Sequence, residues 1–231
     1  TCAKDGEAVS KRLFPDALWV EYIDAGYTLC MELKGRIDQY KAEHGKIPKL
    51  IMLKNHGIFV SGDTAEEIRS LYASVMEPLR AEYDSLGVNE DLGISETGQD
   101  LETEAKIREI FGEDAQFIES SGYFECVPGP ITPDHLVYSR AYPFTDELTQ
   151  EKADAYRAKH GFAPKMLIHG DRVYGLGVTE KNAGLALLFA QDGAQVLKLS
   201  QAFGSVEYMT DRAREFIENW EVESYREKVA S

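Results

Sequence analysis

The chain has 231 residues, of which 43% are hydrophobic and 28% are charged, and its formal net charge is −15. A chain of this length and composition can bury a core as one large domain or as two small ones. The negative charge argues against nucleic acid or an anionic membrane surface as a partner, because both would be repelled. It does not exclude a phosphorylated substrate, since backbone N–H groups at a helix start bind phosphate without a cationic side chain.

The apolar runs and the cysteines indicate a soluble, cytoplasmic protein. The longest apolar run, residues 183–190, is far shorter than the roughly 20 residues that span a bilayer. Cys2, Cys30 and Cys126 have neither metal-ligand nor redox spacing, which indicates a reducing compartment. The first residues show no signal-peptide pattern and begin at Thr1, so we expect a piece of a truncated or processed parent.

The first third of the chain predicts a helix, two strands and a second helix. Helical spacing of apolar residues predicts a helix over residues 27–43, which ends at His44-Gly45. After Pro48 a strand is expected over residues 50–53, then the tight turn Asn55-His56-Gly57 and a second short strand. The second helix begins at the capping box Thr64-Ala65-Glu66-Glu67 and is expected to kink at Pro78. The expected inward positions are Leu29, Leu33, Ile37, Tyr40, Ile68, Leu71, Val75 and Leu79.

The middle of the chain divides it into segments. Residues 84–103 are rich in Gly, Ser, Asn and acidic residues, and we expect domain-like segments at 1–85 and 105–231 with a linker at 86–104. A short helix is expected over residues 102–111. Pro and Gly then punctuate residues 124–135, and a strand is predicted at residues 136–139.

The last third of the chain repeats the first. Residues 38–50 align with residues 154–166, and seven of these 13 positions are identical. Phe59, Gly62 and Thr64 match residues 115 positions later, so one residue is missing in between. We interpret this as two related αββα units, because the period is too long for a solenoid. The second copy is predicted to have a helix capped by Thr145 and ending at His160-Gly161, and a strand over residues 166–169. An amphipathic helix over residues 211–230 is expected to follow.

Two histidines are candidate site residues. His56 lies at a turn between strands, where an imidazole can bind zinc if other ligands are near, or can simply hydrogen-bond the backbone. His135 follows Thr-Pro-Asp in a Pro/Gly-rich turn, so Asp134 and His135 either lie near a substrate or serve the turn or the core. His44 and His160 are interpreted as helix C-terminal cations. Gly175-x-Gly177 lacks the third glycine of a dinucleotide site, so that function is rejected.

The stretch from Pro48 to Glu67, with its Asn55-His56-Gly57 turn, resembles the class II (metal-dependent) aldolase/adducin family. Residues 13–27 are similar to the segment that follows a His-x-His pair in that family. A narrower resemblance, to the rhamnulose-1-phosphate-aldolase-like part of bacterial bifunctional aldolase/short-chain dehydrogenases, is found around residues 62–64, 132–135 and 220–226.

The resemblance implies a function and a fold. It implies an α/β layered sandwich with a central mixed or largely antiparallel sheet flanked by helices, and a homo-oligomer. It implies zinc-assisted retro-aldol cleavage of a phosphorylated or deoxy-sugar ketose, with His56 as one zinc (Zn2+) ligand and Asn55 and Gly57 shaping the turn. The His-x-His ligands would lie before Thr1, because no His-x-His occurs in this chain, and the acid/base residue is not identified.

Two alternatives stay open. An epimerase or decarboxylase of the same superfamily would use the same metal on another substrate. A non-catalytic, adducin-like interaction module would keep the fold without the metal. The absent His-x-His pair and the loss of the ligand position from the second copy favour this second alternative.

Overall fold

The structure, a computed structural model, describes residues 1–220, which form two compact units. The first unit comprises Thr1–Glu90 and Lys198–Tyr208, and the second comprises Asp91–Leu197 and the chain from Met209. Each unit combines helices with a small sheet, consistent with the expected α/β class. Leu92 and Ile94, in the segment predicted as a linker, pack against the core of the second unit.

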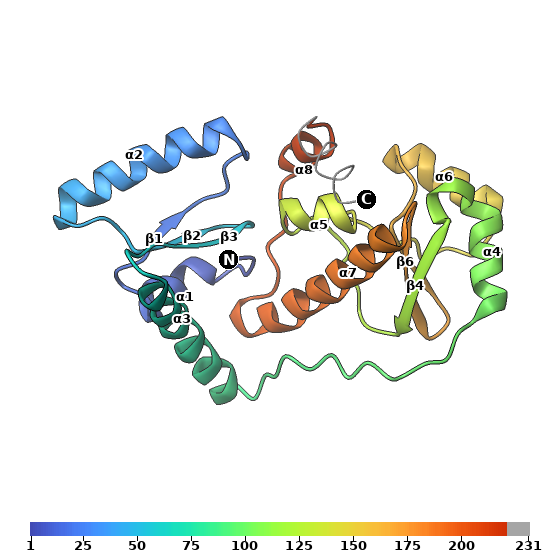
Figure 1. Cartoon of the computed structure of the whole chain (residues 1–231), viewed down its shortest axis with the longest axis horizontal. Coiled ribbons are helices and arrows are strands. Elements are labelled where there is room, and N and C mark those ends of the chain that lie inside the picture. Colours follow the sequence, from blue (N-terminus) through green and yellow to red (C-terminus); the bar gives the residue numbers. More distant parts are fainter. Residues whose placement is uncertain (221–231) are drawn as a thin grey trace. The chain divides into compact units, whose positions relative to one another are not determined.

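The first unit is a three-stranded mixed sheet between helices. The strand order is β1-β2-β3, with β1 parallel to β2 and β2 antiparallel to β3. Helix α2 covers one face, and α1 and α3 cover the other (Figure 1). The elements are α1 (Gly6–Leu13), β1 (Leu18–Val20), α2 (Tyr27–His44), β2 (Leu50–Leu53), β3 (Gly57–Val60), α3 (Ala65–Ser85) and the short 3-10 helix η2 (Gln201–Phe203).

Alternating side chains along β2 explain how the helices sandwich this sheet. Ile51 and Leu53 pack with Leu29 of α2, whereas Met52 packs with Phe14 and with Val75 of α3. Successive residues of a strand point to opposite faces, so an unbroken apolar strand needs cover on both. The apolar run of β2 therefore requires helices on both sides of the sheet.

The second unit is a three-stranded antiparallel sheet with the order β4-β6-β5. One face packs against α4 and α6, and the other against α7 (Figure 1). The last residues of α7, from Lys198, are assigned to the first unit. The elements are α4 (Leu101–Phe111), the 3-10 helix η1 (Gly112–Ala115), β4 (Phe117–Gly122), α5 (Pro133–Tyr138), α6 (Gln150–His160), β5 (Met166–His169), β6 (Arg172–Gly177), α7 (Glu180–Ser200) and α8 (Asp211–Glu218).

The two units share the helix–strand–strand–helix order of the sequence repeat: α2-β2-β3-α3 in the first and α6-β5-β6-α7 in the second. Ile51 pairs with Phe59 across the first hairpin, and Leu167 pairs with Tyr174 across the second, as the alignment requires. The aligned tyrosines also behave alike. The hydroxyl of Tyr40 donates to the carbonyl of Asp16 (2.9 Å), and that of Tyr156 donates to the carbonyl of Tyr142 (2.6 Å).

Most expected starts and ends of the repeat elements are confirmed. The strands over residues 50–53 and 166–169 have the predicted bounds, and α2 and α4 differ from the prediction by one residue at one end. Thr64 caps α3 by accepting from the Glu67 N–H (3.1 Å), as the capping box requires. Gly45 and Gly161 end their helices with φ of 69° and 82°, the left-handed conformation that glycine adopts without strain. Helix α3 continues through Pro78.

Three local predictions are wrong. Residues 136–139 form no strand, because Thr132 caps a helix that begins at Pro133: the Thr132 Oγ1 accepts from the His135 N–H, and proline suits the first turn. Helix α6 is capped by Thr149 rather than Thr145. The predicted C-terminal helix over 211–230 ends at Glu218 in the structure, and residues 221–231 lie outside the described part of the chain.

None of the helices within residues 1–220 is both long enough and apolar enough to cross a membrane.

Candidate functional site

His56 lies in the three-residue turn between β2 and β3. Its backbone N–H donates to the carbonyl of Leu53 (3.2 Å), which closes the turn, and the residue is half-buried. Gly57 follows with a φ of 152°, where a side chain would be strained. The turn therefore holds the imidazole at the end of two paired strands.

Asn55 anchors this turn to the rest of the first unit. It is 2% exposed and has a φ of 52°, a left-handed conformation that asparagine tolerates better than most residues. Its side-chain Nδ2 donates to the carbonyl of Glu207 (2.7 Å), and its backbone N–H donates to the carbonyl of Thr1 (3.1 Å). These bonds fix the residue next to His56 from two distant parts of the chain.

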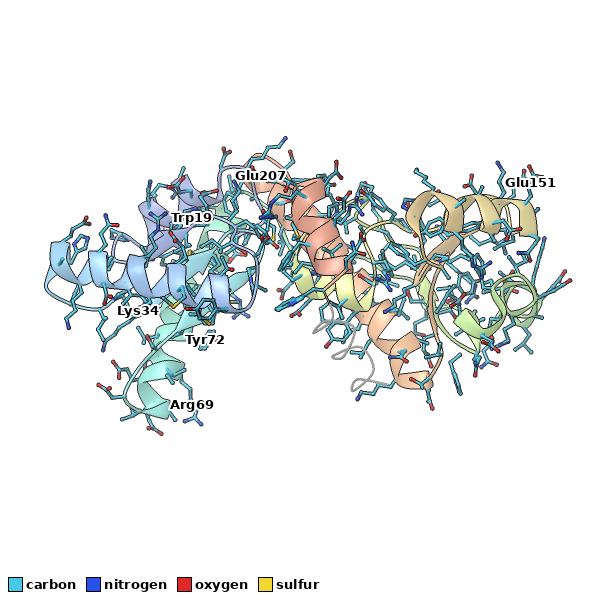
Figure 2. The ribbon with its side chains drawn as sticks, turned by 90° about the horizontal axis from the view of Figure 1, so that it is seen from above. Trp19, Lys34, Arg69, Tyr72, Glu151 and Glu207 are labelled. Atoms are coloured by element: carbon cyan, nitrogen blue, oxygen red, sulfur yellow. The ribbon has the colours of Figure 1, made fainter. Side chains whose placement is uncertain are left out.

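A charged network adjoins the turn. The Nζ of Lys54 lies 2.9 Å from the Glu207 carboxylate and 3.1 Å from that of Glu21. The Nε1 of Trp19 donates to the Glu21 carboxylate (2.8 Å). Figure 2 labels Trp19 and Glu207 in this unit. The hydrogen bond to Glu207 raises the pKa of Lys54. The hydrogen bond from Trp19 and, to a smaller extent, the one from Lys54 lower the pKa of Glu21. Lys54 and Glu21 are therefore both charged near neutral pH.

The residues around His56 do not complete a zinc site by themselves. Within residues 1–220 no group of three or more His, Cys, Asp and Glu side chains lies close enough to hold a metal ion. A catalytic zinc takes about three protein ligands, so the described donors do not fit a full zinc site. His56 is one donor of the preferred type at a fixed position.

The second copy has no histidine at the corresponding turn. Leu53 pairs with Gly57 in the first hairpin, and His169 pairs with Arg172 in the second. Only Gly170 and Asp171 separate β5 from β6, so the missing residue of the repeat falls in this turn. The strand register aligns Arg172 with Gly57, so Asp171 takes the place of His56.

A pocket in the first unit lies at the other end of β2. It has a volume of about 590 Å³ and its lining includes Leu50 at the start of the strand, but not His56. Along a strand the distance from Leu50 to the turn is roughly 13 Å, at about 3.3 Å per residue. The lining residues are Leu13, Phe14, Pro15, Asp16, Ala17, Tyr40, Lys46, Ile47, Lys49, Leu50, Leu71 and Ser74. The pocket and the imidazole are therefore separate features of this unit.

His135 is buried in the second unit and is held between two side chains. Its Nδ1 lies 2.7 Å from the Oγ1 of Thr132, and its Nε2 lies 3.1 Å from the Asp192 carboxylate, without the alignment of a hydrogen bond. Its ring meets the edge of Phe189 with the centroids 5.4 Å apart. At 6% exposure His135 forms part of the core, whereas the adjacent Asp134 is exposed. The two residues therefore do not share a surface.

The structure brings together some predicted residues and adds others. Asn55, His56 and Gly57 form one turn, while Asp134 and His135 belong to the other unit. Sequence reasoning missed the roles of Glu207 and Asp192, because each reaches its partner from a distant segment. The only sequence signal was the pairing of opposite charges on Lys54 and Glu207, which many other pairs in an acidic chain would also offer.

Comparison with protein-family models, with curated proteins and with solved structures finds no match for this chain.

Proposed function

We propose that the chain is part of a class II aldolase-like aldehyde-lyase that cleaves a sugar ketose or its phosphate, such as rhamnulose 1-phosphate. The observation that carries the proposal is the turn at His56: an imidazole at the end of two strands, next to a buried Asn55 that two hydrogen bonds hold in place. A metal ligand needs such a fixed position, because the protein must hold its donors in one geometry.

In this proposal His56 is one zinc ligand, and the other ligands come from polypeptide outside the described residues. Zinc in a class II aldolase polarises a ketose oxygen. Lys54, the first residue of the turn, forms ion pairs with Glu21 and Glu207, and these ion pairs stabilise the turn. Lys54 in this role positions the turn rather than reacting.

The proposal extends to the fold, the assembly and the location. The two α/β units would belong to a layered class II aldolase-like sandwich, and the protein would form a homo-oligomer, as the resemblance implies. The separated cysteines support a cytoplasmic location.

The second candidate function is a non-catalytic, adducin-like interaction module. The exposed edge of the first sheet favours it, because Phe59 on β3 is 48% exposed although its counterpart Tyr174 is fully buried. An epimerase of the same superfamily would share the metal site and differ in the product.

The first experiment is the zinc content, by plasma mass spectrometry, of the protein isolated from its native source, so that the polypeptide that supplies the other ligands is present. We expect about one zinc per chain, as for one ligated site, and loss of that zinc in a His56→Ala variant. His169→Ala is the matched control, because His169 is an exposed histidine beside the equivalent turn and should leave the zinc content unchanged.

Activity separates the three functions. Incubation with rhamnulose 1-phosphate should release dihydroxyacetone phosphate if the lyase proposal is correct, whereas an epimerase would return an isomeric sugar phosphate. A chain of the expected mass that retains no zinc and releases no product would exclude catalysis by these residues and leave the interaction module.

A further inference from the structure

The strand β3 lies at the edge of its sheet, whereas its repeat counterpart β6 is the central strand of the second sheet. Residues Phe117–Gly122 of β4 pair with β6 along its whole length. In the described part of the first unit, β3 pairs only with β2. An edge strand presents backbone N–H and C=O groups that can pair with another strand.

One face of the sheet shows the same difference in its side chains. Tyr174 of β6 is fully buried in a cluster with Ile107 and Phe111 of α4. Phe59 occupies the equivalent position on β3, on the α2 face of its sheet, and is 48% exposed. Helix α4 thus packs on Tyr174, whereas no described helix packs on Phe59 in the same way.

The opposite face repeats the observation. Leu187 of α7 packs against the cluster that contains Phe124, together with Leu92 and Ile94. Its counterpart on α3 is Tyr72, which lies 115 residues earlier and is labelled in Figure 2. The side chain of Tyr72 is 44% exposed. In the second unit, residues 91–126 therefore pair with the edge of β6 and cover the side chains on both faces beside it. Among the described residues of the first unit, no equivalent segment covers Phe59 or Tyr72.

We propose that the outer edge of β3 is the docking site of a polypeptide segment from outside residues 1–231. This segment adds an antiparallel strand to β3 and covers Phe59 with an apolar helix and Tyr72 with its flanking residues, as residues 91–126 do for β6. Backbone hydrogen bonds would supply affinity, and the two aromatic side chains would supply selectivity.

The arrangement in the second unit favours one continuous polypeptide segment, rather than a second copy of the chain, as the occupant of the β3 edge. The cover over Leu187 comes from residues before α4 and after β4, so one segment passes from one face across the edge to the other. In a second copy β3 continues within a few residues into α3, which packs on its own sheet. That strand could pair edge to edge, but its flanking residues are already engaged.

The test uses the full chain with an additional copy of residues 91–126 fused ahead of Thr1 through a flexible Gly/Ser linker of about 15 residues, in which the added Cys126 is replaced by Ser. Fusion makes docking intramolecular, with an effective concentration in the millimolar range. Amide hydrogen exchange of residues 57–60, followed by mass spectrometry, should slow by about tenfold or more relative to the unfused chain.

Two substitutions in the fused chain make the result specific. Phe59→Glu should abolish the added protection, while Tyr27→Glu, which replaces a 79% exposed aromatic residue on α2, should retain it. Because Phe59 is half exposed, its replacement should leave the fold intact, which circular dichroism can verify. Unchanged exchange of residues 57–60 in the fused chain would overturn the proposal. So would an unfused chain that sediments as a dimer with β3 already protected, because the occupant would then be a second copy.

Discussion

At the scale of single residues, Asn55 fixes the position of His56. Asparagine suits this position for two reasons: it tolerates the left-handed backbone at φ 52°, and its side-chain amide reaches the carbonyl of Glu207. A partly buried carbonyl that loses its donor costs free energy, because water replaces the bond incompletely. The residue before the imidazole is therefore expected to matter more to stability than the imidazole itself.

Replacement of Asn55 separates these two contributions. Asn55→Ala should lower the free energy of unfolding of the first unit by about 2–3 kcal/mol, because it loses the partly buried hydrogen bond to Glu207 and strains the backbone. Asn55→Gly should cost less, since glycine keeps the backbone conformation and loses only the amide. Urea denaturation of both variants measures the difference, and equal losses would contradict the backbone contribution.

The three thiols should differ sharply in reactivity. Cys30 is exposed, whereas Cys2 and Cys126 are buried, and burial raises the pKa of the Cys126 thiol to about 12. The thiolate is the reactive form, so a disulfide reagent such as DTNB at pH 8 should modify one thiol quickly. Cys30→Ser should remove the fast phase, and a second fast thiol in wild-type protein would contradict the burial of Cys2 or Cys126.

The shift at Cys126 also has a consequence for stability. Its folded-state pKa is raised, so its contribution to stability is fully present below the unfolded thiol pKa of about 8.5 and is lost as the pH rises towards 12.

At the scale of elements, the strand–helix contact differs between the two copies. A Cβ added to Gly175 of β6 would lie 2.4 Å from the carbonyl oxygen of Ala183 and 2.7 Å from the backbone nitrogen of Leu187, both in α7. The first copy has Val60 at this position. Alanines on the inner side of α7, such as Ala183 and Ala186, are fully buried there. The small residues allow α7 to approach β6 closely, and α7 has more buried apolar residues than α3, in which only Val75 is buried.

Gly175→Ala should therefore destabilise the second unit by about 2–3 kcal/mol or more, since backbone atoms would have to move. Gly184→Ala is the matched control: it lies on α7 with open space around its Cβ position, and alanine there should stabilise the helix by up to about 1 kcal/mol. Thermal unfolding of both variants gives the comparison. If Gly175→Ala left the stability of the second unit unchanged, α7 would not be held this close to β6.

At the scale of the whole molecule, the chain consists of two units that each have their own core. Leu53 lies in the α2-side cluster of the first unit, and Leu167 lies in the α4- and α6-side cluster of the second. Two cores can unfold separately, in which case a single free energy of unfolding does not describe the chain. The contacts within each unit then determine the unfolding temperature of that unit.

Truncation of one core should shift one transition only. Leu53→Ala and Leu167→Ala replace side chains that are 2% and 0% exposed, and each should cost about 2–5 kcal/mol. In differential scanning calorimetry we expect the two variants to lower different transitions. A single transition that both variants shift equally would contradict the independence of the units.

Features that depend on neighbouring residues could be predicted from the sequence. The capping box at Thr64, the helix ends at Gly45 and Gly161 and the strands of both hairpins all follow from signals a few residues long. The turn at His56 belongs to this group, because Asn-His-Gly between two apolar runs is a local signal. The sequence repeat also strengthened the prediction of helices and strands, because the same pattern occurs in both copies.

Features that depend on distant contacts were decided by the tertiary structure. The anchor of the turn joins Asn55 to Glu207, 152 residues away, and Asp192 reaches His135 from α7. The strand β4 was not predicted, because only its pairing with β6 stabilises a run that includes Glu119, Ser120 and Ser121. Local patterns act within about one helical turn, whereas long-range pairs are chosen by packing. The sequence by itself thus determined the two helix–strand–strand–helix units and the turn that carries His56. The tertiary structure decided what holds that turn, which strands share a sheet, and which edge is left open.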